Sequence, residues 1–167
     1  MEINHNAPVR VRGEIELFAP PEMVWDWLSR VDLWQDWHPE ITNSRWLNRP
    51  GMNAEFKWRL RAVLGITSRI ESWEERRELG FSGQVWSTTL RHVFRLDGDF
   101  RRTRVLSEAS VEGSGCGFAP LRALISGQMA RTNDLWLGAL KTRLESEKFK
   151  GRDRSWDMGD MVERPPA

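Results

Sequence analysis

His92 is the residue whose type and position best suit chemistry in the interior of this chain. It lies between Leu90 and Phe94 in a run where apolar residues alternate with arginines. An alternation of period two predicts a strand with His92 on its apolar face. A neutral imidazole there could act as a general base or orient a ligand carbonyl. A buried histidine that is hydrogen-bonded for structure alone fits the same pattern.

Two hydroxyl groups occupy comparable positions. Ser68 lies between two isoleucines, and Thr103 shares a face with Val105. Either hydroxyl could contact a ligand, whereas a hydrogen bond to a backbone carbonyl is the simpler interpretation. The candidate catalytic residues are therefore His92 and Ser68. His38, before Pro39, is interpreted as a loop histidine in water, with a place at the mouth of a cavity as the alternative.

Aromatic residues are unusually abundant, with 10 Trp and 7 Phe but no Tyr in 167 residues. Rings on inward faces could form a stacking wall for a flat ligand, or they could simply fill a core. The predicted ligand-binding residues combine these rings with the polar candidates. They are Phe56, Trp58, Ser68, Phe81, His92, Phe94, Thr103, Met129 and Trp136.

Charge and motif content exclude several classes of protein. Lys and Arg number 25 against 24 Asp and Glu, so the formal net charge is +1 and gives no long-range attraction to nucleic acid. The arginines opposite the apolar faces fit a solvated outer face better than an anion or RNA site. The single cysteine, Cys116, and only three histidines predict no disulfide, no metal and no cofactor. We expect a cytoplasmic monomer or homodimer without a membrane span.

The elements that must position these residues follow from periodicity. A strand is predicted over 9–18, and short helices follow Pro20 and precede Pro39. Six strands joined by turns are predicted from Ile41 to about Gly113. A long amphipathic helix begins near Pro120, and residues 150–167 are predicted to be a poorly ordered tail.

This order and several local patterns resemble a known superfamily. The patterns include Trp34-x-x-Trp37-x-Pro39, Phe56-x-Trp58 and His92-x-Phe94-x-Leu96. The chain resembles the SRPBCC superfamily, which includes START-like and polyketide cyclase/dehydrase-like proteins, from about residue 10 to 147. The resemblance implies an α+β helix-grip fold over residues 1–149, in which a curved antiparallel sheet wraps the last helix and leaves an internal cavity.

The resemblance also implies an apolar small-molecule ligand, such as a lipid or an aromatic compound. We favour a binder or carrier, because the alternation of side chains along the predicted strands places no Tyr, Asp or Glu beside His92 in the interior. The alternative is a cofactor-independent polyketide cyclase, aromatase or dehydratase with His92 as general base. A bulge or helix rotation that turned Glu108 or Asp134 inward would favour that enzyme. A domain with a filled interior is the third possibility.

Overall fold

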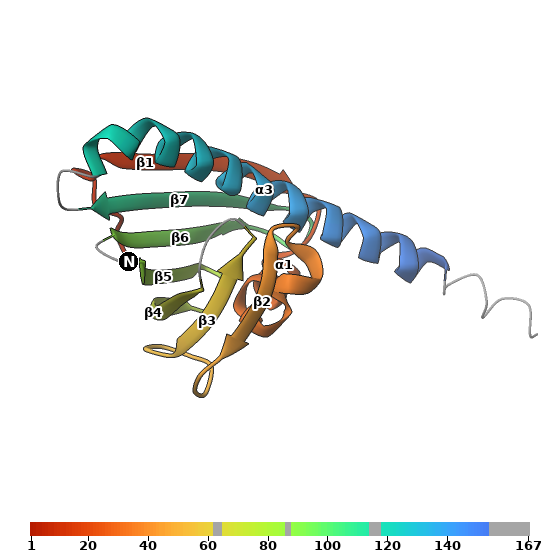
Figure 1. Cartoon of the computed structure of the whole chain (residues 1–167). Coiled ribbons are helices and arrows are strands. Elements are labelled where there is room, and N and C mark those ends of the chain that lie inside the picture. The colour runs from red at the N-terminus through yellow and green to blue at the C-terminus, as the bar shows by residue number, and fades with distance from the viewer. Residues whose placement is uncertain (62–64, 86–87, 114–117, 154–167) are drawn as a thin grey trace, which may run out of the picture.

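The fold is a single antiparallel sheet with one long helix across its face (Figure 1). The computed structural model describes residues 1–61, 65–85, 88–113 and 118–153. Its seven strands follow the order β1-β7-β6-β5-β4-β3-β2, in which every neighbouring pair is antiparallel. The predicted first strand and six-strand meander are therefore confirmed.

The strands follow the predicted alternation of inward and outward side chains. A bulge between Ile70 and Ser72 interrupts that alternation in β4, so that Ser72 faces outward and Trp73 packs against the core. The strand bounds are β1 Val9–Leu17, β2 Ile41–Trp46, β3 Glu55–Leu60, β4 Ile66–Glu74, β5 Glu78–Val85, β6 Thr88–Gly98 and β7 Thr103–Gly113.

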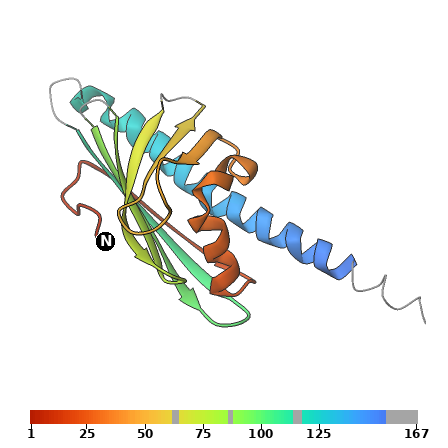
Figure 2. The same cartoon turned by 90° about the horizontal axis from the view of Figure 1, so that it is seen from below.

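All helices cover the same face of the sheet (Figure 2). Pro21 begins the first helix, where its fixed φ angle suits the first turn. The long helix packs most closely on β1 and β7, and the short helices connect β1 to β2. The helix bounds are α1 Pro21–Ser29, η1 Val31–Leu33, α2 Trp34–Trp37 and α3 Phe118–Asp153.

The opposite, outer face of the sheet carries the N-terminal segment, residues 1–8 (Figure 2). Arg95 joins Glu78 at 2.9 Å and Glu108 at 2.5 Å, and it also donates a hydrogen bond to the Met1 carbonyl oxygen at 2.9 Å. The Met1 amine pairs with Glu78. We call these residues the outer charged network, and it holds the N-terminal segment against the sheet.

Some sequence predictions meet the limits of the described residues. Helix α3 continues beyond Phe149 to Asp153, and the rest of the predicted 150–167 tail lies outside the described residues, as does Cys116. The division into a 1–149 domain and a tail stays a prediction. Within the described ranges, no helix is long and apolar enough to cross a membrane.

Candidate functional site

Aromatic rings occupy the space between the sheet and α3. Trp34 lies at the centre of this aromatic cluster, with ring centroids 4.8 Å from Trp136, 5.3 Å from Phe56 and 5.6 Å from Phe81. These four side chains are almost completely buried. The sequence predicts an internal cavity between the sheet and the last helix, and these four buried rings lie in that region. The alternation of side chains along a strand shows which face of the sheet a residue lies on, but not how much space the neighbouring side chains leave in the interior.

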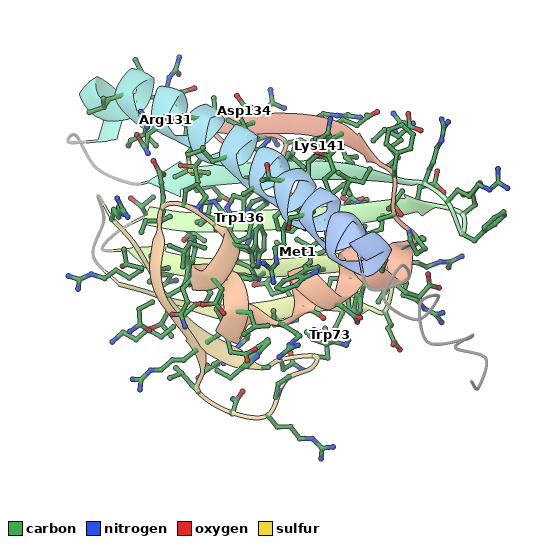
Figure 3. The ribbon with its side chains drawn as sticks, turned by 90° about the vertical axis from the view of Figure 1, so that its right-hand side faces the viewer. Met1, Trp73, Arg131, Asp134, Trp136 and Lys141 are labelled. Atoms are coloured by element: carbon green, nitrogen blue, oxygen red, sulfur yellow. The ribbon has the colours of Figure 1, made fainter. Side chains whose placement is uncertain are left out.

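The predicted inward residues occupy this cluster to different degrees. Trp136 projects from α3 toward the sheet, while Asp134 points to another side of the helix (Figure 3). Trp58 and Phe94 are also buried, and Phe94 lies 5.5 Å from Trp136 between ring centroids. Met129 is only half-buried, near the start of α3. The predicted rings therefore pack together, whereas Met129 is not brought into the described cluster, and a ligand-binding role for these residues stays a prediction.

His92 is held in the cluster by a chain of three side chains. Its Nε2 lies 2.8 Å from the Ser107 hydroxyl, and that hydroxyl donates to Asn133 Oδ1 at 2.6 Å. Because the one hydroxyl proton goes to Asn133, Ser107 must accept from a protonated His92 Nε2. Burial, with His38 nearby as the second cause, lowers the pKa of His92 to about 3. His92 is therefore a neutral ring whose Nδ1 carries the lone pair.

A glycine in β1 makes room for this polar chain. A Cβ at Gly13 would stand 2.6 Å from Asn133 Nδ2 and 2.9 Å from a Leu137 methyl carbon. Gly13 pairs with Ser107 across the β1–β7 ladder. Because Gly13 has no side chain, α3 can approach the sheet closely at the point where Ser107 of β7 bonds to Asn133 of α3. Sequence reasoning missed Ser107 and Asn133. Two features of the sequence indicated them. Ser107 occupies the same alternating, inward positions of β7 as Thr103 and Val105, and Asn133 lies three residues before Trp136, on the same side of a helix.

The two candidate hydroxyls have structural partners. Ser68 accepts a hydrogen bond from the Trp58 indole at 3.0 Å, and Thr103 donates to the Ala19 carbonyl oxygen at 2.7 Å. Thr103 lies four residues along β7 from Ser107, whose hydroxyl contacts His92. The structure therefore does not bring Ser68 or Thr103 into a hydrogen-bonded group with His92.

His38 differs from its sequence interpretation as a solvated loop residue. It is 1% exposed, and its ring centroid lies 4.4 Å from that of Trp136. Its Nδ1 accepts the Glu40 backbone N–H at 3.3 Å, which leaves the proton on Nε2. Burial lowers the pKa of His38 to about 4. The aromatic cluster thus contains two neutral imidazoles, because His38 caps the end of α2, just before the turn at Pro39 and Glu40, and its ring lies inward.

An open groove runs along the outer side of this cluster, between α2 and α3. Its volume is about 570 Å³. Trp37 forms one wall, and its ring centroid lies 5.4 Å from that of Trp136. The groove is lined by Asp36, Trp37, Pro39, Asp134, Leu135, Gly138, Ala139, Thr142, Arg143 and Ser146.

The carboxylates of Glu108 and Asp134, which could have acted together with His92 in catalysis, do not lie beside it. Glu108 faces outward and pairs with Arg95 at 2.5 Å. Asp134 is exposed at the groove. In the part of the chain that the structure describes, no three His, Cys, Asp or Glu side chains gather as a possible metal site.

The fold and this interior define a helix-grip protein: seven antiparallel strands around a long C-terminal helix, with neutral histidines among buried rings. The chain belongs to the polyketide cyclase/dehydrase and lipid transport family, whose model matches residues 8–145, and thereby to the SRPBCC superfamily. No curated protein matches it in sequence.

Solved structures share the fold at low sequence identity. A START superfamily protein from Mycobacterium smegmatis is 16% identical with a TM-score of 0.69, and the alignment covers 82% of this chain and 97% of that one. A Thermus thermophilus protein is 19% identical with a TM-score of 0.70, covering 83% and 98%. The ZhuI aromatase/cyclase from Streptomyces sp. R1128 is 16% identical with a TM-score of 0.71, covering 81% and 93%. These likenesses establish the fold.

Proposed function

We propose that this protein binds a small, uncharged hydrophobic or aromatic molecule against the aromatic cluster, between the sheet and α3, and carries it without transforming it. The observation that supports this most directly is the groove of about 570 Å³, because its wall residue Trp37 also contacts Trp136 of the cluster. Groove and interior therefore meet at one pair of rings.

The polarity of the cluster favours an uncharged ligand. His38 and His92 are both neutral at physiological pH, and the Ser107 hydroxyl and Asn133 amide carry no charge. A charged ligand group placed among buried rings without a counterion would lose its hydration and gain little in return. Apolar ligand surface, by contrast, gains roughly 25 cal/mol for each Å² that leaves water.

As parts of the same proposal, the protein works in the cytoplasm as a monomer or homodimer, and it uses no metal or organic cofactor. The family description includes lipid transport, which is consistent with carriage of an apolar cargo.

Fluorescence titration with 2-acetylnaphthalene tests the proposal. Binding at the ring cluster should quench the intrinsic tryptophan emission, and Trp37→Ala should weaken the affinity at least tenfold. Phe100→Ala is the matched control, because this aromatic side chain is 76% exposed on the loop between β6 and β7. Native mass spectrometry of protein purified from its own host should detect a bound neutral molecule. No saturable quenching and no bound molecule would contradict the proposal.

Catalysis by His92 is the second candidate, and one observation favours it. The chain from Asn133 through Ser107 orients the imidazole, as a third group orients the base in many enzymes. The pKa of about 3 counts against it, since an efficient general base has a pKa near the working pH. Turnover of a diketide probe that His92→Gln abolishes, with ligand affinity retained, would establish catalysis in place of carriage.

A further inference from the structure

The hairpin formed by β2, β3 and the turn between them concentrates positive charge at one edge of the sheet (Figure 1). Residues 41–61 contain five cationic side chains and one carboxylate, so their formal charge is +4. The whole chain has a formal charge of +1, and the remaining residues therefore carry −3. We call residues 41–61 the basic hairpin. Its cationic residues, all exposed, are Arg45, Arg49, Lys57, Arg59 and Arg61.

The cations of the basic hairpin have no carboxylate partners. Among the described residues, no ion pair involves any of the five. Arg45 lies directly opposite Lys57 in the β2–β3 register, and Arg59 follows two positions along the same face. Like charges in opposite positions destabilise a pair of strands. On β7, by contrast, Arg104 pairs with Glu14 at 2.6 Å. The hairpin thus keeps its charge at a cost to the sheet, which indicates a role outside the fold.

A second groove, on the outer side of the hairpin, gathers three of these cations. Its volume is about 640 Å³, and Arg45, Lys57 and Arg59 line it together with Thr42 and Asn43. Lys57 and Arg59 reach the outer face because they alternate with buried aromatic residues of β3. Guanidinium, ammonium and amide groups all donate hydrogen bonds to phosphate oxygens. The groove therefore suits the phosphate group of a larger partner.

Exposed apolar side chains lie on the same hairpin. Leu47, two positions after Arg45, is 46% exposed, and Met52 in the turn is 56% exposed. Basic and apolar side chains together are typical of a peripheral membrane contact, in which cations meet anionic headgroups and apolar groups enter the boundary with the acyl chains. Single-stranded RNA would instead require exposed rings for its bases, and every aromatic side chain of the hairpin is half-buried or buried. The hairpin therefore fits a lipid surface better than RNA.

We propose that the basic hairpin docks this protein on an anionic lipid surface. Arg45, Lys57 and Arg59 contact the phosphate groups of the lipids. Leu47 and Met52 enter the boundary between headgroups and acyl chains. This docking goes beyond ligand binding at the aromatic cluster and does not depend on it, because these side chains lie on the outer side of the sheet and in the turn.

Vesicle co-sedimentation tests the proposed partner. Vesicles of phosphatidylcholine with about one-third phosphatidylglycerol should bind the protein at least tenfold more tightly than vesicles of phosphatidylcholine alone. Raising NaCl from about 0.1 M to about 0.5 M should remove most of that preference, because salt screens exposed charges. Equal binding to both kinds of vesicle, or binding to neither, would overturn the proposal. Tighter binding to single-stranded RNA than to anionic vesicles would make the hairpin a nucleic-acid site instead.

A double variant locates the contact on the hairpin. Arg45→Gln/Lys57→Gln should lower the affinity for anionic vesicles at least fivefold. Its melting temperature should stay unchanged or rise slightly, because the variant removes two opposed like charges. The matched control, Arg10→Gln/Arg122→Gln, removes the same charge from exposed positions on β1 and α3, and it should lower the affinity less than twofold. Equal losses in the two variants would mean that the vesicles respond to net charge alone, and the assignment to the hairpin would be wrong.

A second pair of variants tests the apolar contact. Leu47→Ser/Met52→Ser should weaken binding to anionic vesicles at least threefold at both salt concentrations, since hydrophobic contact is not screened by salt. Leu124→Ser is the control, because this side chain is 72% exposed on α3 and lies outside the hairpin. Binding of Leu47→Ser/Met52→Ser as tight as that of the native chain would contradict the entry of these side chains into the lipid.

Discussion

The two faces of the sheet bury polar groups in opposite ways. On the inner face, the His92–Ser107–Asn133 chain is neutral and enclosed by aromatic rings. On the outer face, Arg95 binds two carboxylates, Glu78 and Glu108, whose side chains remain 13% and 11% exposed. The inner chain depends on hydrogen bonds in a dry surrounding, whereas the outer charged network depends on ion pairs close to water.

This difference explains what each face is suited to do. The outer network fastens the N-terminal segment across the sheet, since Arg95 also contacts the Met1 carbonyl oxygen. The inner chain presents a neutral ring to any apolar molecule that reaches it. Burying a charged pair there would carry a desolvation cost of several kcal/mol per ion. A neutral interior therefore favours an uncharged ligand on the helix side of the sheet.

Truncation of Trp136 should produce the largest difference between the faces. Trp136→Ala removes a fully buried indole that packs on Trp34 and Phe94, and we expect the free energy of unfolding to fall by about 3–5 kcal/mol. Urea denaturation followed by circular dichroism measures this loss. Added indole should restore part of it by occupying the cavity that the substitution creates.

Phe100→Ala is the comparison for that measurement. Its ring is 76% exposed, so the change in the free energy of unfolding should stay within about 0.5 kcal/mol. A loss at Trp136 no larger than the loss at Phe100 would mean that the aromatic cluster does not stabilise the fold.

Much of the fold was predictable from the sequence because it follows from local patterns. The strand around His92 shows period-two alternation, and its neighbours in the sheet do the same, so both the number of strands and the inward direction of His92 were correct. The long helix was likewise predictable from its apolar stripe. Helix α3 begins at Phe118, two residues before the predicted start at Pro120.

The site was less predictable, because it depends on contacts between distant segments. Ser107 and Asn133 are 26 positions apart and meet only when α3 packs on β7. His38 enters the interior from the junction between α2 and the turn at Pro39 and Glu40, which the alternation of side chains along a strand does not describe. The packing of the interior was not predictable for a further reason: Trp34 lies at the centre of the buried aromatic cluster, and the volume of side chains in three dimensions does not appear in a one-dimensional pattern.

Acid should destabilise the inner face through its histidines. Both have a pKa lowered from 6.5, His38 to about 4 and His92 to about 3, so between those values and 6.5 the unfolded chain binds more protons than the folded chain. Stability must therefore fall as pH drops below 6.5, by about 1.4 kcal/mol per pH unit for each histidine. Urea denaturation at pH 7, 6, 5 and 4 measures the slope.

His92→Gln isolates one part of that pH dependence. It should lower the slope by about 1.4 kcal/mol per pH unit, since only one buried imidazole remains. An unchanged slope in His92→Gln would show that the His92 ring takes up a proton as readily in the folded chain as in the unfolded one.

Salt should change the contribution of the outer face to the free energy of unfolding and leave that of the inner face unchanged. We expect this to be the smallest of the effects predicted here. Arg95→Met leaves Glu78 and Glu108 without their shared cation, and we expect a loss of about 1–3 kcal/mol at low salt. The difference in the free energy of unfolding between this variant and the native chain should become smaller in about 0.5 M NaCl, because salt screens charges near water.

Arg91→Met is the matched control. The ion pair of Arg91 with Glu112 is longer, 3.4 Å, and both side chains are about one-third exposed, so the loss of unfolding free energy should be below about 1 kcal/mol. The Trp136→Ala loss should be the same at both salt concentrations, since no ion pair contributes to it. If Arg95→Met were as insensitive to salt as Trp136→Ala, the network would act through packing of its aliphatic stem, and the two faces would differ less than their charges suggest.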